Sequence, residues 1–189
     1  MTGKTHQAIG LTAGTAAYLI YVTPVYGPAS LAWVLVLSSL AALLPDVDQP
    51  GSKIWKILPF GKVGGELVNP FLQHRNLSHS LLGLALVAWG SHALLYLIPS
   101  YWGVNIPVVW AVFLISYASH LLADMVTVEG IPLLFPYQRM FGIPPYPLQG
   151  VRIETGGWFE NLVIFPAVNL LFLVLLWMKW PVLHTLLFH

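Results

Sequence analysis

The chain has no cysteine among its 189 residues, and charged residues make up only 8% of it. The lack of cysteine excludes disulfides, thiolate nucleophiles and cysteine-ligated zinc, so a metal would have to be held by His, Asp or Glu. Soluble domains contain about 25% charged residues, which this chain falls far below. The net charge of +1 provides no basic field for nucleic acid, so we expect no nucleic-acid partner.

Hydrophobic residues are abundant instead, at 57% with a mean hydropathy of +0.75, which indicates an integral membrane protein with one domain, 1–189. A membrane-spanning helix needs about 20 apolar residues. The chain has five apolar segments of about this length, at 6–23, 29–45, 79–98, 106–126 and 160–179. We therefore expect an all-α bundle of about five transmembrane helices. The first segment follows Lys4 as in a secretory signal, but it lacks a small-x-small cleavage pattern, so we expect it to be retained.

Two longer connections, 46–78 and 127–159, join these segments on one side of the membrane. The first carries lysines beside Trp55 and is expected to lie along the interface as a short amphipathic piece. The second is rich in proline and aromatic residues, so it cannot be one long helix. It suits an interfacial or re-entrant cap over the bundle, although simple packing would explain both connections equally well.

The basic residues divide unequally between the two sides of the membrane. Threading the chain through five spans puts the N-terminus and both connections on one side. Seven of the eight basic residues lie there: Lys4, Lys53, Lys56, Lys62, Arg75, Arg139 and Arg152. Only Lys179 lies near the other side. The positive-inside rule then predicts a cytoplasmic N-terminus and an external C-terminus.

His120 and Asp124 lie four residues apart at the end of an apolar segment, so they project from one face of a helix. Ionisable groups at membrane depth are costly and usually functional. A simpler alternative is one hydrogen bond that holds two helices together. The same threading, however, brings ligand-type groups from every span to this side: His6, Asp46, Asp48, His74, His79, His120, Asp124 and Glu160. This convergence favours a metal site.

Imidazole and carboxylate ligands together suit zinc, with manganese or iron as alternatives, whereas an all-oxygen site would suggest magnesium or calcium. The candidates outnumber one tetrahedral shell, so one or two divalent ions would fit. Arg75 could bind a phosphate or stabilise developing anionic charge. Asp46 and Glu160 are the candidate general bases. Thr127, seven residues after His120, is a candidate second-shell donor.

Several sequence blocks resemble a known bacterial family. They are Thr5-His6, Leu43-Leu-Pro-Asp46-Val-Asp48, His74-Arg75-Asn-Leu-Ser-His79-Ser80, Ser119-His120-Leu-Leu-Ala-Asp124-Met-Val-Thr127 and Gly130-Ile-Pro-Leu-Leu-Phe-Pro136. Together they resemble the YdjM-type family, described as LexA-regulated, membrane-bound, metal-dependent hydrolases. Ser78 stands where relatives often have Thr, and Asn76 where Gly is common; neither change affects a ligand.

The resemblance runs from residue 5 to about residue 165. It implies an inner-membrane hydrolase with metal ligands at the matching positions, which are His6, Asp46, Asp48, His74, His79, His120 and Asp124. Glu160 also looks like a matching acidic position, whereas Glu154 does not clearly match. The resemblance supports the class of reaction more than the substrate.

From these patterns we expect hydrolysis of a phosphoester or ester of a membrane lipid by metal-activated water at the cytoplasmic membrane edge. Two rival hypotheses are a metal-ion binding or transport protein and a membrane organiser whose polar cluster only holds helices together. Transporter sites typically lie near the midplane and are built from repeats with broken helices. This sequence has no internal repeat, and the helix stripes below the ligand-type groups carry small, uncharged residues at that depth, which disfavours transport. The sequence does not determine the oligomeric state.

Overall fold

The computed structural model describes residues 1–21, 28–49, 51–57, 61, 77–99 and 102–188. The regular secondary structure in this part of the chain is helical, apart from two isolated β-bridges that join Thr127 to Ile153 and Ile131 to Phe141. The main helices are α1 (Gly3–Tyr21), α2 (Pro28–Ala41), α5 (Leu81–Leu95), α6 (Ile106–Met125) and α7 (Phe165–Met178). They occupy the five predicted segments, which confirms the all-α class.

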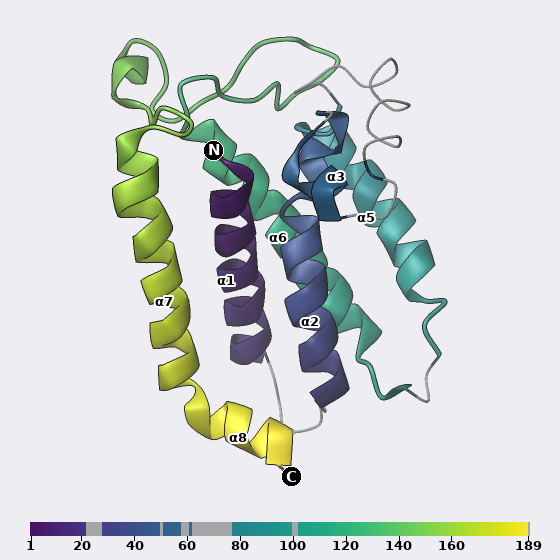
Figure 1. The fold of residues 1–189 in the computed structure, drawn as a ribbon. Helices are drawn as coiled ribbons and strands as arrows, with labels where there is room; N and C mark the ends of the chain where they lie inside the picture. Colours follow the sequence, from purple (N-terminus) through teal and green to yellow (C-terminus); the bar gives the residue numbers. More distant parts are fainter. Residues whose placement is uncertain (22–27, 50, 58–60, 62–76, 100–101, 189) are drawn as a thin grey trace.

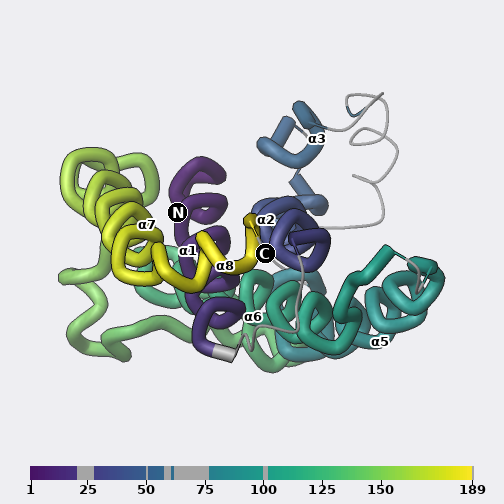
Figure 2. Tube along the Cα trace, turned by 90° about the horizontal axis from the view of Figure 1, so that it is seen from below, coloured from purple at the N-terminus to yellow at the C-terminus, as the bar shows by residue number. Residues whose placement is uncertain are grey.

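Helices α1, α2 and α6 pack against one another, α7 packs on α1, and α5 packs on α6 (Figure 1). The view from below shows the same neighbours, with α7 and α5 on opposite sides of the bundle (Figure 2). Glycine permits the closest approaches. A Cβ on Gly10 would lie 2.2 Å from Ala42 Cβ, and one on Gly14 would lie 2.1 Å from Ser38 Oγ. The helices can come this close because the contact faces carry small residues.

Among the described residues, two helical stretches are long and apolar enough to cross a membrane, Ile106–Met125 and Glu160–Met178. The second stretch begins with a π-helical turn, η4 (Glu160–Ile164), and continues into α7, which has no buried residue. An apolar helix without a buried face needs an apolar surrounding, and a bilayer supplies one.

The expectation of five spans is not confirmed. Helices α2 and α5 have only 14 and 15 residues, fewer than the usual 17 to 25. α2 stops at Ala41 because Pro45, four residues on, has no N–H to donate to the Ala41 carbonyl, and the chain turns into a 3-10 helix, η1 (Leu44–Asp48). α5 starts only at Leu81, where Ser80 Oγ accepts a hydrogen bond from Gly83 N.

The described parts of the two connections lie at the end of the bundle that also holds the N-terminus (Figure 1). The first contributes η1 and the short helix α3 (Lys53–Ile57). The second is irregular, with one 3-10 turn, η3 (Leu148–Val151), and three cis peptide bonds before Pro136, Pro144 and Pro147. It is therefore not one long helix, as predicted. At the opposite end α8 (Trp180–Phe188) folds across the bundle and buries Leu183 and Leu186.

Candidate metal centre

His120 and Asp124 lie one turn apart on α6, and both side chains are buried. α6 is well defined because Asn105 Oδ1 caps its first turn by accepting from Val108 N, with Pro107 in that turn. The His120 Nε2 atom lies 3.5 Å from Asp124 Oδ2. The predicted pair therefore shares one helix face.

His79, just before α5, and Asp46, in η1, meet this pair from two other segments. The two Nε2 atoms of His79 and His120 are 3.3 Å apart. Each of them lies 3.7 Å from Asp46 Oδ1, and His79 Nε2 lies 3.6 Å from Asp124 Oδ2. Neighbouring ligands of a tetrahedral zinc ion with bonds of 2.0–2.2 Å are separated by about 3.3–3.6 Å. The donor atoms of Asp46, His79 and His120 lie within 4.8 Å of one another, and so do those of His6, His120 and Asp124, so two overlapping groups of three could each hold an ion.

In His120 and in His79, the hydrogen-bond partner of Nδ1 shows which ring nitrogen carries the proton. His120 Nδ1 lies 2.7 Å from the carbonyl oxygen of Ala42, which can only accept, so Nδ1 carries the hydrogen. His79 Nδ1 lies 3.0 Å from Ser78 Oγ and 3.4 Å from Asp48 Oδ2. Ser78 Oγ already donates to Asp48 at 2.6 Å, so it accepts from His79 Nδ1.

Both Nε2 atoms consequently direct lone pairs into a space bounded by two carboxylates. Lone pairs at 3.3 Å and two nearby anionic groups repel one another unless a cation lies among them. Metal-bound histidines generally donate their other N–H to a carbonyl or carboxylate, as His120 and His79 do here. The donor set and its orientation fit a divalent metal.

His6, in the first turns of α1, lies beside this cluster. Its ring stacks on that of His120, with centroids 3.6 Å apart, and its Nε2 atom lies 3.0 Å from Asp124 Oδ1. Its Nδ1 atom is buried and has no hydrogen-bond partner in the described structure. The Met1 amino group also contacts Asp124 Oδ1. The two Asp124 oxygens therefore face different donor groups, with His6 on one side and His79 and His120 on the other.

The remaining predicted residues take other positions. Asp48 orients His79 through Nδ1 and Ser78 rather than facing the Nε2 atoms. Thr127 Oγ1 donates to the backbone oxygen of Asp124 at 2.8 Å, so it stabilises the end of α6 behind the cluster. His74 and Arg75 lie outside the described residues.

Glu160 is buried in a separate hydrogen-bond network. Its Oε1 atom accepts from Thr2 N, Thr2 Oγ1 and Thr5 Oγ1, and its Oε2 atom accepts from Gly156 N. These four hydrogen bonds match the roughly four acceptor positions of a carboxylate. Glu160 therefore fixes the start of α1, directly before His6.

Sequence reasoning missed the residues that orient the ligands. The Ala42 carbonyl is a backbone group with no sequence signal. Ser78 was noted only as a position where relatives often have Thr, and the sequence did not show that its hydroxyl lies between Asp48 and His79. The backbone oxygen of Ser78 also accepts a hydrogen bond from Tyr117 OH. The position of Ser78 between His74 and His79 was the available hint.

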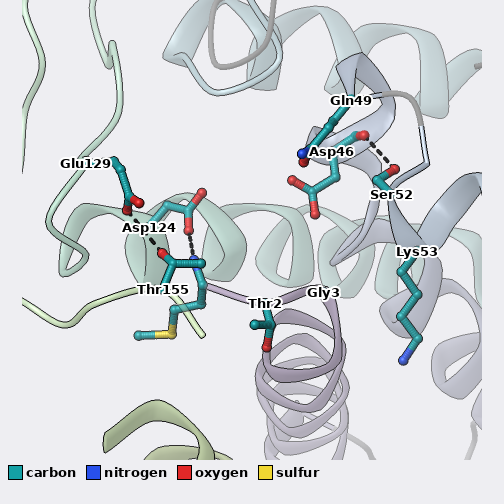
Figure 3. A pocket seen from close by; sticks show the side chains of 10 residues that line it. Thr2, Gly3, Asp46, Gln49, Ser52, Lys53, Asp124, Glu129 and Thr155 are labelled. Atoms are coloured by element: carbon teal, nitrogen blue, oxygen red, sulfur yellow. Dashed lines mark hydrogen bonds and ion pairs between the residues drawn. The ribbon is translucent and has the colours of Figure 1, made fainter. Parts of the chain in front are cut away.

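A pocket of about 560 Å³ opens beside the cluster at the end of the bundle. Asp46 and Asp124 line it, together with Thr2 at the start of α1 (Figure 3). The wall formed by η1 and the start of α3 adds Ser52 and Lys53. The side chain of Asp46 is 13% exposed, whereas that of His79 is fully buried. The cluster is thus accessible from one side, through its carboxylates.

The fold and this site define a helical membrane protein with a buried His/Asp cluster and a polar pocket at one end of its bundle. The chain belongs to the YdjM inner membrane protein family, whose sequence profile matches residues 1–187. This confirms the resemblance found in the sequence.

Two relatives illustrate the relationship. The chain is 34% identical over 165 residues to the uncharacterized protein YvsG of Bacillus subtilis (strain 168), covering 87% of this chain and 88% of YvsG. It is 30% identical over 161 residues to the inner membrane protein YdjM of Escherichia coli (strain K12), covering 82% of this chain and 76% of that protein. No solved structure matches this chain.

Proposed function

We propose that the protein is a membrane-bound, metal-dependent hydrolase that acts on a phosphoester or ester of a membrane lipid. One observation supports this proposal most: two imidazole Nε2 atoms and two carboxylates converge beside an open pocket. Their orientation suits a divalent metal better than hydrogen bonding alone, because both histidines use their N–H groups elsewhere.

His79, His120, Asp46 and Asp124 would hold this metal, most suitably zinc, with manganese or iron as alternatives. His6 and the second Asp124 oxygen could hold another ion. A divalent ion in such a site lowers the pKa of water from 15.7 to about 7 and polarises a carbonyl or phosphoryl oxygen.

Residues of the chain would supply the proton acceptor, orient the ligands and stabilise developing charge in the proposed reaction. Asp46 reaches the pocket and could accept a proton from the attacking water. Ser78 and Asp48 would keep the His79 ring oriented. Glu160, whose oxygens are engaged by Thr2, Thr5 and Gly156, would position the start of α1 rather than act as a base. Arg75 remains the proposed partner for developing anionic charge.

A lipid substrate fits the position of the pocket. The pocket is lined by Thr2, which bonds to Glu160 at the start of the apolar, unburied stretch Glu160–Met178. In the proposed topology of five spans, the pocket lies at the cytoplasmic face of the inner membrane. Shorter helices such as α2 would then require local thinning of the bilayer.

The test compares metal-stripped protein with zinc- or manganese-loaded protein in mixed micelles of phosphatidic acid, phosphatidylglycerol or phosphatidylcholine. Mass spectrometry distinguishes products of phosphoester cleavage from products of acyl-ester cleavage. We expect turnover only with metal, reduced at least about 100-fold by Asp46→Asn and unchanged by Glu154→Gln, an exposed control acid. Loaded protein that binds metal but cleaves no lipid would instead favour metal binding or transport.

A further inference from the structure

The second connection, residues 127–159, exposes several large apolar side chains at the end of the bundle that holds the N-terminus. Tyr146 is 80% exposed, Val151 75% and Trp158 72%, and the turn η3 that contains Val151 has no buried residue. Single exposed apolar residues are common, but a group of them within a short stretch marks a contact with a protein or a membrane. The bundle leaves these side chains largely uncovered, so we expect a partner to cover them.

This surface continues directly into the apolar stretch Glu160–Met178, which is long enough to cross a membrane. Trp158 and Phe159 immediately precede that stretch, and both are exposed, with ring centroids 5.6 Å apart. Figure 1 shows the connection at the same end of the bundle as the start of α7, and Figure 2 shows it along the outer edge of the bundle. The exposed side chains therefore lie where a bilayer crossed by α7 would meet water.

The composition of the connection suits the headgroup layer of a membrane. Tyr and Trp are enriched at membrane–water interfaces. No acidic residue lies between Glu129 and Glu154, whereas Arg139 and Arg152 both do. Arg139 is exposed, and its guanidinium carbon lies 5.9 Å from the centre of the Phe141 ring. A basic, aromatic surface without carboxylates is complementary to anionic lipid headgroups.

The backbone of the connection also suits a layer in which water is scarce, where unpaired N–H groups are costly. Five prolines between residues 132 and 147 contribute no N–H. Ile131 and Phe141 exchange two backbone hydrogen bonds, of 2.9 and 2.7 Å, and Ile143 N donates to Met125 O at 2.7 Å. The last of these bonds fastens the connection to the final residue of α6.

We propose that the second connection docks in the headgroup layer of the membrane that α7 crosses, with its exposed apolar side chains among the lipids and Arg139 beside anionic headgroups. Docking of this kind would hold whether or not the protein hydrolyses a lipid. Glu129 and Thr155, near the two ends of the connection, line the polar pocket. A docked connection therefore puts one wall of that pocket at the membrane surface.

Nitroxide labels on single cysteines test the docking, because the chain has no cysteine of its own. Full-length protein carrying Leu148→Cys or Val151→Cys is labelled and reconstituted into vesicles of phosphatidylethanolamine and phosphatidylglycerol. Power-saturation EPR compares the access of oxygen, which concentrates in the bilayer, with that of a water-soluble nickel chelate. We expect both labels to lie about 5–10 Å into the boundary between headgroups and acyl chains, the depth typical of interfacial segments.

Two control labels bracket this depth. Leu170→Cys, exposed on α7, should lie deep in the bilayer, and Gln49→Cys, exposed beside the polar pocket, should lie in water. Labels at 148 and 151 that are as accessible to the nickel chelate as the label at 49 would overturn the proposal. Spin–spin broadening that disappears on dilution with unlabelled protein would also overturn it, because a second copy would then cover this surface.

Arg139→Gln tests the contribution of charge. In vesicles with phosphatidylglycerol it should move the label at 151 toward water, whereas in pure phosphatidylcholine it should have no effect. Lys179→Gln, at the opposite end of α7, is the matched control and should leave the depth unchanged in both. A depth that depends neither on anionic lipid nor on Arg139 would overturn the assigned headgroup contact. Label depth is independent of turnover, so failure of docking leaves the proposed hydrolase intact, and absence of turnover leaves the docking intact.

Discussion

At the residue scale, the orientation of the two histidine ligands depends on groups that lie behind them and do not face the proposed metal. Ala42, through its carbonyl, and Ser78 with Asp48 accept the outer N–H groups of the two histidines, so the inner nitrogens are left with lone pairs. Partners of this kind fix ring orientation and raise the basicity of the ligand. The affinity for metal should therefore be sensitive to side chains behind the ligands.

Ser78→Ala and Asp48→Asn should each weaken zinc binding about 10- to 100-fold, because His79 would lose the group that fixes its tautomer. Competition with a chromogenic chelator measures the Kd for zinc in detergent. Ser91→Ala is the matched control, since Ser91 lies on α5 and donates to Ala88 O in the same helix. Unchanged affinity in both site variants would contradict the assigned orientation of His79.

At the scale of the elements, the packing of α1, α2 and α6 determines the geometry of the site, because each helix carries a site residue or leads into a residue that orients one. Their approach depends on Gly14, where an added Cβ would lie 2.1 Å from Ser38 Oγ and 2.5 Å from Ser116 Oγ. Both neighbours are buried, so neither has room to move away. The glycine is thus required by packing.

Gly14→Leu should separate these helices and destabilise the protein by about 1–3 kcal/mol or more, as overpacking of a tight contact does. Gly90→Leu is the control, because a Cβ on Gly90 meets nothing within 4 Å and the residue lies on α5. Thermal unfolding in detergent should show a lower Tm for Gly14→Leu only. A similar Tm for both variants would contradict the role of the close contact.

The sequence predicted the positions of the helices and the ligands on α6, because apolar runs and a four-residue spacing carry that information. It did not predict how short α2 and α5 would be, since proline and cap positions shorten helices inside apolar segments. It also missed α8, which continues an apolar segment past Lys179. Contacts such as those between Glu160 and Thr5, 155 residues apart, have no local signature.

The sequence also did not predict that Asp46 and Asp48 have different roles in the site. Asp46 and Asp48 are two residues apart and chemically identical, yet Asp46 faces both Nε2 atoms while Asp48 supports His79 from behind. The 3-10 geometry of η1 directs them to different sides of the imidazole ring. Only the three-dimensional arrangement distinguishes their roles.

At the scale of the whole molecule, the proposed topology puts the metal centre at the cytoplasmic face and α8 at the outer face. The cysteine-free chain allows a clean test with single cysteines and a membrane-impermeant maleimide. In spheroplasts, Lys179→Cys should be labelled directly and Lys56→Cys only after permeabilisation. The reverse pattern would contradict the positive-inside assignment.

The central claim is that His79, His120, Asp46 and Asp124 form a metal centre. Measuring the metal content of the purified protein tests this claim most directly. Inductively coupled plasma mass spectrometry on detergent-purified protein should find at least one zinc, manganese or iron ion per wild-type chain. His120→Ala should lose it, while His92→Ala, an exposed histidine beside Tyr96 and Trp110, should keep it. A folded wild type without stoichiometric metal, or a His120→Ala variant that retains all of it, would contradict the account.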